Sequence, residues 1–224
     1  MRGFTLTEIM IAVTIFSLLM VGATQFLIDG YEVTFVTEKK LEINADIREV
    51  TNGIFDEARG ANYFVMYQSF FPDDTGTPPG DFRNPTSGYS AEDYRQRKGN
   101  SGDFVVFVYT GVDANPNDAT PAPIERLVGY LRDDSAADSS EAPVMRFDIN
   151  IPAADQNKTV EELIPTVDQK TNFKTVINLV TGLANGNLFY NVEDRSVLIN
   201  GKIIHGNQAK QVTGTYNFTV SPRG

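Results

Sequence analysis

The sequence contains no cysteine and only one histidine. Disulfide bonds and thiolate metal sites are therefore excluded for this chain, and an exported domain must be held by packing alone. The histidine, His205, comes just after an apolar strand pattern and precedes Gly206, so we expect it in a solvated loop. Nucleophile elbows and phosphate-binding glycine loops are also missing from the sequence. We therefore predict that the chain is not an enzyme.

Basic residues are fewer than acidic ones: the chain has 19 lysines and arginines and 29 aspartates and glutamates, which gives a formal net charge of -10. Such a charge repels phosphate backbones and anionic lipids. The basic cluster Tyr94-Arg95-Gln96-Arg97-Lys98 includes an aromatic residue, as sites for single-stranded nucleic acid do. The charge of the whole chain favours a solvated loop instead, and we expect no nucleic-acid partner.

Formal charges are absent from Ile9 to Ile28, and proline is absent from Phe4 to Phe71. A helix of about 20 apolar residues crosses about 30 Å of hydrocarbon. Arg2 precedes this segment and Asp29 follows it, so the positive-inside rule predicts a single-pass membrane protein with a cytoplasmic N-terminus and the chain from Asp29 onward on the other side of the membrane. The alternatives are a buried core helix, a cleaved secretory signal and a simple membrane anchor.

The chain opens with Arg2-Gly3-Phe4-Thr5-Leu6-Thr7-Glu8, directly before the apolar segment. This string resembles the leader and cleavage motif of type IV pilins and type II secretion pseudopilins. In that family a glycine precedes the cut, a phenylalanine follows it, and a glutamate lies four positions further on. The resemblance implies that prepilin peptidase cuts between Gly3 and Phe4 and methylates the new amine of Phe4. It also implies other pilins or pseudopilins and an inner-membrane assembly platform as partners.

Glu8 lies at the edge of the apolar segment, where a carboxylate costs free energy unless it is neutralised or paired. In a bundle of helices at low dielectric, a carboxylate on one subunit can pair with the free amine of a neighbour, which offsets part of the desolvation of both groups. We therefore predict that Glu8 pairs with the Phe4 amine of an adjacent subunit during assembly.

Beyond Asp29 the pattern becomes amphipathic. Apolar residues recur every three or four positions, at Ile43, Ile47, Val50, Ile54, Ala58 and Ala61. Only glycines interrupt it, so we expect one helix from about Phe4 to about Arg59, roughly 80 Å long. The stretches 44–48 and 56–61 also resemble the stalk of J-type minor pseudopilins. A solvated helix face without a specific partner is the alternative.

The rest of the chain predicts an antiparallel β-sheet after a long loop over 72–102. Apolar runs predict strands at 104–109, 127–131, 144–151, 188–192 and 212–220. Thr159 and Glu162 have capping-box spacing, which predicts a short helix over 160–164. Asn200-Gly201, flanked by predicted strands at 197–199 and 202–204, predicts a type I′ hairpin turn. The predicted fold class is α+β and pilin-like, with a long N-terminal helix packed on the sheet.

Two acidic loops are weak calcium candidates. Asp113, Asn115, Asn117 and Asp118 supply oxygen ligands of the kind that calcium prefers, but their spacing departs from the EF-hand pattern. The second loop runs from Asp133 to Glu141. Solvated turns are the simpler interpretation, and we expect no cofactor.

The resemblance implies a leader peptide at 1–3, a helix at 4–28 that lies first in the inner membrane and then in the filament core, and a periplasmic C-terminal domain. The sequence patterns predict an amphipathic stalk at 29–62 and a β-rich domain at 63–224. The predicted function is a structural subunit, a minor pilin or minor pseudopilin, of a type IV pilus or type II secretion filament. Two alternatives stay open: a major or adhesive pilin, and a membrane-anchored periplasmic binding module that does not polymerise.

Overall fold

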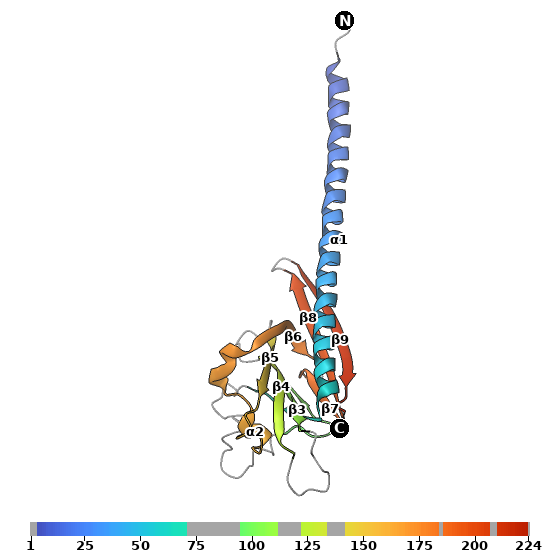
Figure 1. Cartoon of the computed structure of the whole chain (residues 1–224). Coiled ribbons are helices and arrows are strands. Elements are labelled where there is room, and N and C mark those ends of the chain that lie inside the picture. The colour runs from blue at the N-terminus through green and yellow to red at the C-terminus, as the bar shows by residue number, and fades with distance from the viewer. Residues whose placement is uncertain are drawn as a thin grey trace, which may run out of the picture.

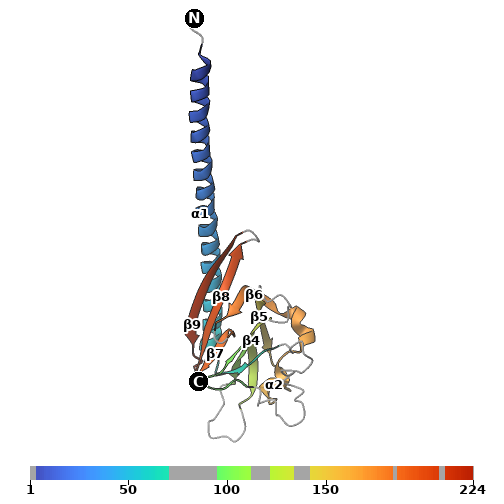
Figure 2. The same ribbon diagram turned by 180° about the vertical axis from the view of Figure 1, so that it is seen from behind.

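The computed structural model describes residues 4–70, 95–111, 122–133, 142–183, 186–206 and 210–223. Its architecture is α+β: a long N-terminal helix projects from an antiparallel sheet (Figure 1). Helix α1 (Leu6–Gly60) has 55 residues, which confirms the single helix predicted from the sequence. The N-terminal part of α1 stands clear of the sheet, and its C-terminal part lies along it (Figure 2).

The described strands follow α1 in chain order. They are β1 (Tyr63–Tyr67), β2 (Ser101–Gly102), β3 (Phe104–Thr110), β4 (Ile124–Arg132), β5 (Ala142–Asn150), β6 (Lys174–Gly182), β7 (Phe189–Val192), β8 (Ser196–Gly206) and β9 (Gln211–Val220). Helix α2 (Val160–Leu163) and the 3-10 helix η2 (Val167–Asn172) lie between β5 and β6. The predicted capping box is present at the start of α2, where Thr159 and Glu162 bind each other's backbone.

All nine strands belong to one sheet, and every pairing is antiparallel, as predicted. The order is β1-β3-β4-β5-β6-β8-β7-β2, and β9 pairs with β8 outside that path. Strand β8 is therefore the branching strand, with β9 along one side and β6 and β7 along the other. The β8–β9 hairpin runs beside α1 in both views (Figures 1 and 2).

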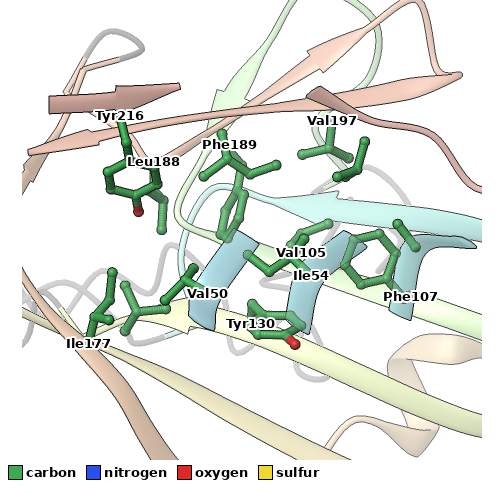
Figure 3. Packing of buried hydrophobic residues seen from close by; sticks show 14 of the residues in the cluster. Val50, Ile54, Val105, Phe107, Tyr130, Ile177, Leu188, Phe189, Val197 and Tyr216 are labelled. Atoms are coloured by element: carbon green, nitrogen blue, oxygen red, sulfur yellow. The ribbon is translucent and has the colours of Figure 1, made fainter. Parts of the chain in front are cut away.

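One side of α1 forms the main core with the sheet. Ile43, Val50, Ile54 and Ala58 are buried there, at the three- and four-residue spacing seen in the sequence. Figure 3 shows Val50 and Ile54 among apolar side chains of the sheet. Each fully buried side chain of this size contributes about 1.5–3 kcal/mol relative to exposure. This core fixes the stalk on the domain.

The opposite face of the sheet carries a second, aromatic core. Phe104 contacts Phe70 edge-on, with ring centroids 5.2 Å apart, and Phe147 packs on Phe173. Val160 of α2 covers part of this face. The sheet is thus apolar on both faces, because α1 covers one face and the β5–β6 connection covers the other.

The predicted hairpin turn at Asn200-Gly201 is wrong: β8 runs straight through both residues. Gly201 pairs with Gly182 on one side and Tyr216 on the other. A Cβ on Gly201 would lie 3.0 Å from a ring carbon of Tyr216 and 3.1 Å from Leu188. This glycine therefore makes room for a tyrosine ring rather than for a turn. The tight turn is at Glu193 and Asp194, with φ of 57° and 55°.

Candidate assembly site at the N-terminal helix

Helix α1 begins with a capping box at Thr5 and Glu8. The Glu8 Oε2 atom accepts hydrogen bonds from the Thr5 backbone N–H at 2.9 Å and from the Thr5 hydroxyl at 3.0 Å. The Glu8 N–H donates in return to Thr5 Oγ1 at 3.3 Å. Such a cap satisfies N–H groups that would otherwise lack partners at the helix start. Glu8 therefore has a local partner within its own chain.

The role of Thr5 as the N-cap of α1 was not predicted from the sequence. The pattern Thr5-Leu6-Thr7-Glu8 is a threonine followed three residues later by a glutamate, directly before an apolar run. That spacing is the same signal that located the start of α2.

The N-terminal part of α1 exposes its apolar side chains. Every residue from Phe4 to Thr34 is exposed within the chain, and Phe4 itself is 84% exposed. In the described part of the chain, α1 is the one helix long and apolar enough to cross a membrane, and its most apolar part is not buried within the chain. A helix that is apolar all round needs lipid or other helices around it. This segment fits a single-pass membrane anchor.

The few hydroxyl groups within this apolar segment are satisfied by their own helix. Thr14, Ser17 and Thr24 each donate to the backbone carbonyl four residues earlier, at 2.8 Å. Hydrogen-bonded in this way, a hydroxyl is tolerated among lipid tails or closely packed helices. These residues add no polar stripe, so the whole circumference of the helix can face apolar surroundings.

The C-terminal end of the stalk is held by a charged cluster. Glu57 of α1 accepts from Arg146 at 2.6 Å and from Arg126 at 3.2 Å. Arg126 also holds Asp148 through two bonds, at 2.8 and 2.7 Å. Tyr109 donates to the Glu57 carboxylate and, at 2.8 Å, to the Glu57 backbone oxygen. One helix residue is thereby tied to β3, β4 and β5.

This cluster shifts the pKa values of its members. The hydrogen bond from Arg126 is the largest cause that lowers the pKa of Asp148 below its ordinary value. Burial raises the pKa of Tyr130, whose ring lies 6.0 Å from the Arg146 guanidinium, to about 12. Charge-assisted hydrogen bonds of this kind are stronger than neutral ones. Asp148 therefore stays ionised over the whole physiological pH range.

His205 does not lie in a solvated loop, contrary to the sequence prediction. It is part of β8 and faces α1, where its Nε2 atom is 2.7 Å from Asp46 Oδ2 and its Nδ1 atom is 3.5 Å from Glu42 Oε2. Further along, Lys210 forms an ion pair with Glu32 of α1. These contacts hold the β8–β9 hairpin against the side of the stalk.

Two basic residues in the described part of the basic cluster, Arg95 and Lys98, form intramolecular ion pairs. Arg95 binds Glu161 through two hydrogen bonds, at 2.6 and 3.0 Å, and Lys98 pairs with Glu193. Burial raises the pKa of Glu161, but the bonds from Arg95 and Tyr67 outweigh it, so this pKa is lowered. Arg95 thus belongs to a buried structural network, and Tyr94 lies outside the described residues.

Several predicted site residues lie outside the described residues: Gly3 of the cleavage site, and the calcium candidates Asp113, Asn115, Asn117 and Asp118. Of the second acidic loop only Asp133 is described. Among the described residues, no group of three or more acidic or histidine side chains is placed to hold a metal ion. Calcium binding, cleavage after Gly3 and pairing of Glu8 with Phe4 all stay predictions.

Comparison with known proteins gives one match, and it falls on this end of the chain. Residues 1–24 match the model of the prokaryotic N-terminal methylation motif. Comparisons with curated proteins and with solved structures gave no match. The matched segment includes the capping box and most of the exposed apolar helix described above. The chain therefore begins with the N-terminal methylation motif of type IV pilin-like proteins.

Proposed function

We propose that this protein is a structural, non-enzymatic subunit of a type IV pilus or type II secretion filament, and within it a minor pilin or J-type minor pseudopilin. Prepilin peptidase removes residues 1–3 and methylates Phe4. The chain then waits in the inner membrane, with its β-rich domain in the periplasm, until the assembly platform moves it into the filament. The observation that carries the proposal is the methylation motif at residues 1–24, which coincides with an exposed apolar helix.

The exposed helix supports assembly by packing. A filament subunit needs one helical segment that can exchange lipid for neighbouring helices, and a second segment that holds its own domain. In α1 the exposed segment ends near Thr34, the partly buried residues begin at Phe35, and the first buried residue is Ile43. Only van der Waals packing and polar pairs distinguish helix neighbours from lipid, because both are equally apolar. A polar group at a fixed position can therefore set the register of the helices.

Glu8 is the group proposed for that role, through pairing with the methylated amine of Phe4 in an adjacent subunit. The capping bonds use Oε2 of Glu8, and Oε1 accepts no hydrogen bond within the described part of the chain. One oxygen can thus keep the helix capped while the other meets a neighbour's amine. Pairing offsets part of the desolvation that each charge suffers.

Mass spectrometry of the mature N-terminus tests the proposal. Protein recovered from cells that contain the processing peptidase is expected to begin at an N-methylated Phe4. A chain that begins at Met1 under these conditions contradicts processing, and with it the filament role. Cleavage near Gly22 instead identifies a secretory signal. An unprocessed but membrane-bound chain is expected for the binding module that does not polymerise.

A pair of substitutions separates the charge of Glu8 from its capping role. Glu8→Gln keeps a side-chain oxygen for the Thr5 N–H but removes the negative charge. Thr5→Ala removes the hydroxyl of the cap, which costs about 1 kcal/mol of helix stability, but leaves the charge intact. We expect Glu8→Gln to be absent from sheared filaments and Thr5→Ala to be present. Equal incorporation of both variants would show that Glu8 acts only as a cap.

Abundance distinguishes a minor from a major subunit. In sheared filaments we expect this chain to be a small fraction of the total protein, with another pilin as the bulk component. A filament composed mainly of this chain identifies it as the major pilin. Neither result changes the role proposed for the N-terminal motif and helix, because major and minor subunits share these features.

A further inference from the structure

Two asparagines of the sequence stand in the pattern that marks acceptors of N-linked glycans. In that pattern a serine or threonine lies two positions after the asparagine, and the residue between them is not proline. The sequence contains two matches, Asn157-Lys158-Thr159 and Asn217-Phe218-Thr219. A motif this short also occurs by chance, so the structure around each asparagine decides which of the two an enzyme can use.

Asn157 lies in an exposed turn between β5 and α2. Neither its backbone nor its carboxamide forms a hydrogen bond with another described residue. The turn itself is supported from the N-terminal side. The Gln156 carbonyl accepts a hydrogen bond from the Ile124 N–H at 2.8 Å, and Gln156 Nε2 donates to the Ile151 carbonyl at 3.3 Å. The Asn157 amide is thus presented to solvent on an anchored turn.

Asn217 has the same pattern in a different setting. It lies inside β9 and pairs with Asn200, one of ten consecutive residue pairs between β8 and β9. The preceding residue, Tyr216, is buried in the core between α1 and the sheet. A modifying enzyme needs a segment that can leave the domain surface, and exposed loops supply such segments far more readily than paired strands. The structure therefore favours Asn157 over Asn217.

An acidic residue lies two positions before Asn157. Bacterial enzymes that glycosylate asparagine favour an aspartate or glutamate at this position, and Asp155 occupies it, whereas Thr215 stands at the corresponding position before Asn217. Asp155 pairs with Lys158 at 2.6 Å within the same turn, and both side chains remain partly exposed. The carboxylate is therefore at the surface, where an enzyme reaches it. This second difference also favours Asn157.

The hydroxyl that the motif requires belongs to Thr159, which is also the N-cap of α2. Its Oγ1 atom lies 3.3 Å from Glu162 Oε2 and 3.4 Å from the Glu162 backbone nitrogen, so both hydrogen bonds of the hydroxyl are long. Helix α2 has four residues, so little structure depends on this cap. Local opening of the turn therefore exposes the asparagine and the hydroxyl together at a small cost in free energy.

The position of this turn in the fold suits a bulky modification. Helix α2 begins at Val160, directly after the motif, and lies at the end of the domain far from the N-terminus and to one side of α1 in both views (Figures 1 and 2). A glycan on Asn157 would leave the exposed apolar part of α1 free to pack among other helices. It would add a hydrophilic group to the surface of the domain.

We propose that Asn157 is an acceptor for an N-linked oligosaccharide. The donor is an oligosaccharide joined to a membrane lipid through a pyrophosphate. The Asn157 carboxamide nitrogen forms a bond with C1 of the first sugar, the bond between that carbon and the pyrophosphate oxygen breaks, and the amide releases one proton. The lipid pyrophosphate is the leaving group. The inference rests on the proposed function in one respect, the placement of the β-rich domain across the membrane, where this transfer takes place.

Mass spectrometry of the full chain, purified from membranes of the source cells, tests the inference. Peptides that contain Asn157 are expected to carry the mass of an oligosaccharide and to release sugar fragment ions. Peptides that contain Asn217 are expected to be unmodified. An unmodified Asn157 would overturn the inference. Equal modification of Asn217 would overturn it as well, because the structural argument separates the two sites.

Substitutions around the motif separate glycan transfer from a change in folding. We expect Asn157→Gln and Thr159→Ala to abolish the electrophoretic shift that the glycan causes, and Asn217→Gln, the matched control, to keep it. Thr159→Ser keeps the hydroxyl, and Glu162→Ala removes only the capping partner, so both variants should stay glycosylated. A shift that persists in Asn157→Gln, or a shift lost in Glu162→Ala, contradicts the inference. Circular dichroism melting of each variant checks that the fold is retained.

The inference and the proposed function fail in different ways, because Phe4 and Asn157 are read in the same digest. A methylated Phe4 together with an unmodified Asn157 contradicts the glycan and leaves the filament role intact. A glycosylated Asn157 on a chain that is unprocessed and absent from filaments contradicts the filament role. The inference then holds, because the domain has still crossed the membrane.

Discussion

From Leu6 to Thr34 every residue of α1 is exposed within the chain, whereas from Phe35 to Gly60 one side of the same helix is covered by the sheet. The first part has apolar side chains around its whole circumference, and the second confines them to a stripe. One continuous backbone thus carries two different interfaces. The first interface is completed only by lipid or other chains, and the second is complete within the chain. Substitutions should therefore act on folding in the second part and on assembly in the first.

The largest expected effect on folding is from Ile54→Ala. Ile54 is 1% exposed and lies in the core between α1 and the sheet, so truncation leaves a cavity. We expect the free energy of unfolding to fall by about 2–5 kcal/mol. Leu19→Ala, at a position 66% exposed within the chain, is the matched control and should not change it. Chemical denaturation of the full chain in detergent measures the free energy of unfolding of both variants. Equal losses would contradict the proposed difference between the two parts of α1.

Glycine substitutions test the same difference between the exposed part and the sheet-packed part of α1. A Cβ on Gly214 would lie 2.8 Å from Cγ2 of Ile43, so Gly214→Ala forces the stalk and β9 apart, at a cost of about 1–3 kcal/mol. A Cβ on Gly30 meets nothing within 4 Å, so Gly30→Ala should stabilise the helix by up to about 1 kcal/mol. Thermal unfolding followed by circular dichroism should show a lower melting temperature for Gly214→Ala and a higher one for Gly30→Ala. A destabilised Gly30→Ala chain would mean that α1 is already in contact with something at that level.

A smaller effect is expected from the hairpin contact at His205. This side chain is partly exposed, and partly exposed polar pairs of this kind contribute about 0–1 kcal/mol. His205→Ala and Asp46→Ala should each lower the stability slightly, and a double-mutant cycle should give a coupling free energy below about 1 kcal/mol. A larger coupling would place His205 among the main supports of the stalk.

The smallest effect should be that of acid on Asp148, because its carboxylate is partly solvated. Its pKa in the folded chain is below the ordinary value of 3.8, so the unfolded chain binds the proton more readily. The contribution of Asp148 is therefore fully present above the ordinary pKa and is lost as the pH falls through the folded-state pKa. Unfolding measured from pH 5 to pH 2 should show a shallower loss of stability for Asp148→Asn than for the unchanged chain.

The parts of the fold that were predicted from the sequence are those with an uninterrupted pattern. Helix α1 has a three- and four-residue apolar spacing at Ile43, Val50 and Ile54, and β9 alternates over its whole length. Strand β6 was not predicted, because register shifts on both of its sides remove the alternation from its sequence. The apolar stripe of α1 shows which face of the helix packs on the sheet. The sequence of β6 contains no such pattern, so it does not indicate which strands lie beside it.

Long-range contacts explain the remaining errors. Asn200-Gly201 has the local signature of a turn, yet Gly201 is selected by the Tyr216 ring from another strand. His205 was placed in a loop because Gly206 follows it, whereas Asp46, which it contacts, is 159 residues away in the sequence. The N-terminal motif was predictable because Gly3, Phe4, Glu8 and the apolar run all lie close together in the sequence, whereas the Thr5 cap was missed although its signal is equally local.

The way that β9 lies beside α1 determines how the protein bears a mechanical load. A pull on α1 along its axis reaches the domain in part through the Glu57 contacts and in part through β9, a strand that runs in the same direction and is tied to the helix near Glu32 and near Ala61. The β8–β9 ladder is then loaded in shear, so its ten residue pairs resist the force together instead of opening one after another. A tensile force transmitted by the helix should therefore extract the whole domain as a unit before it unravels the sheet.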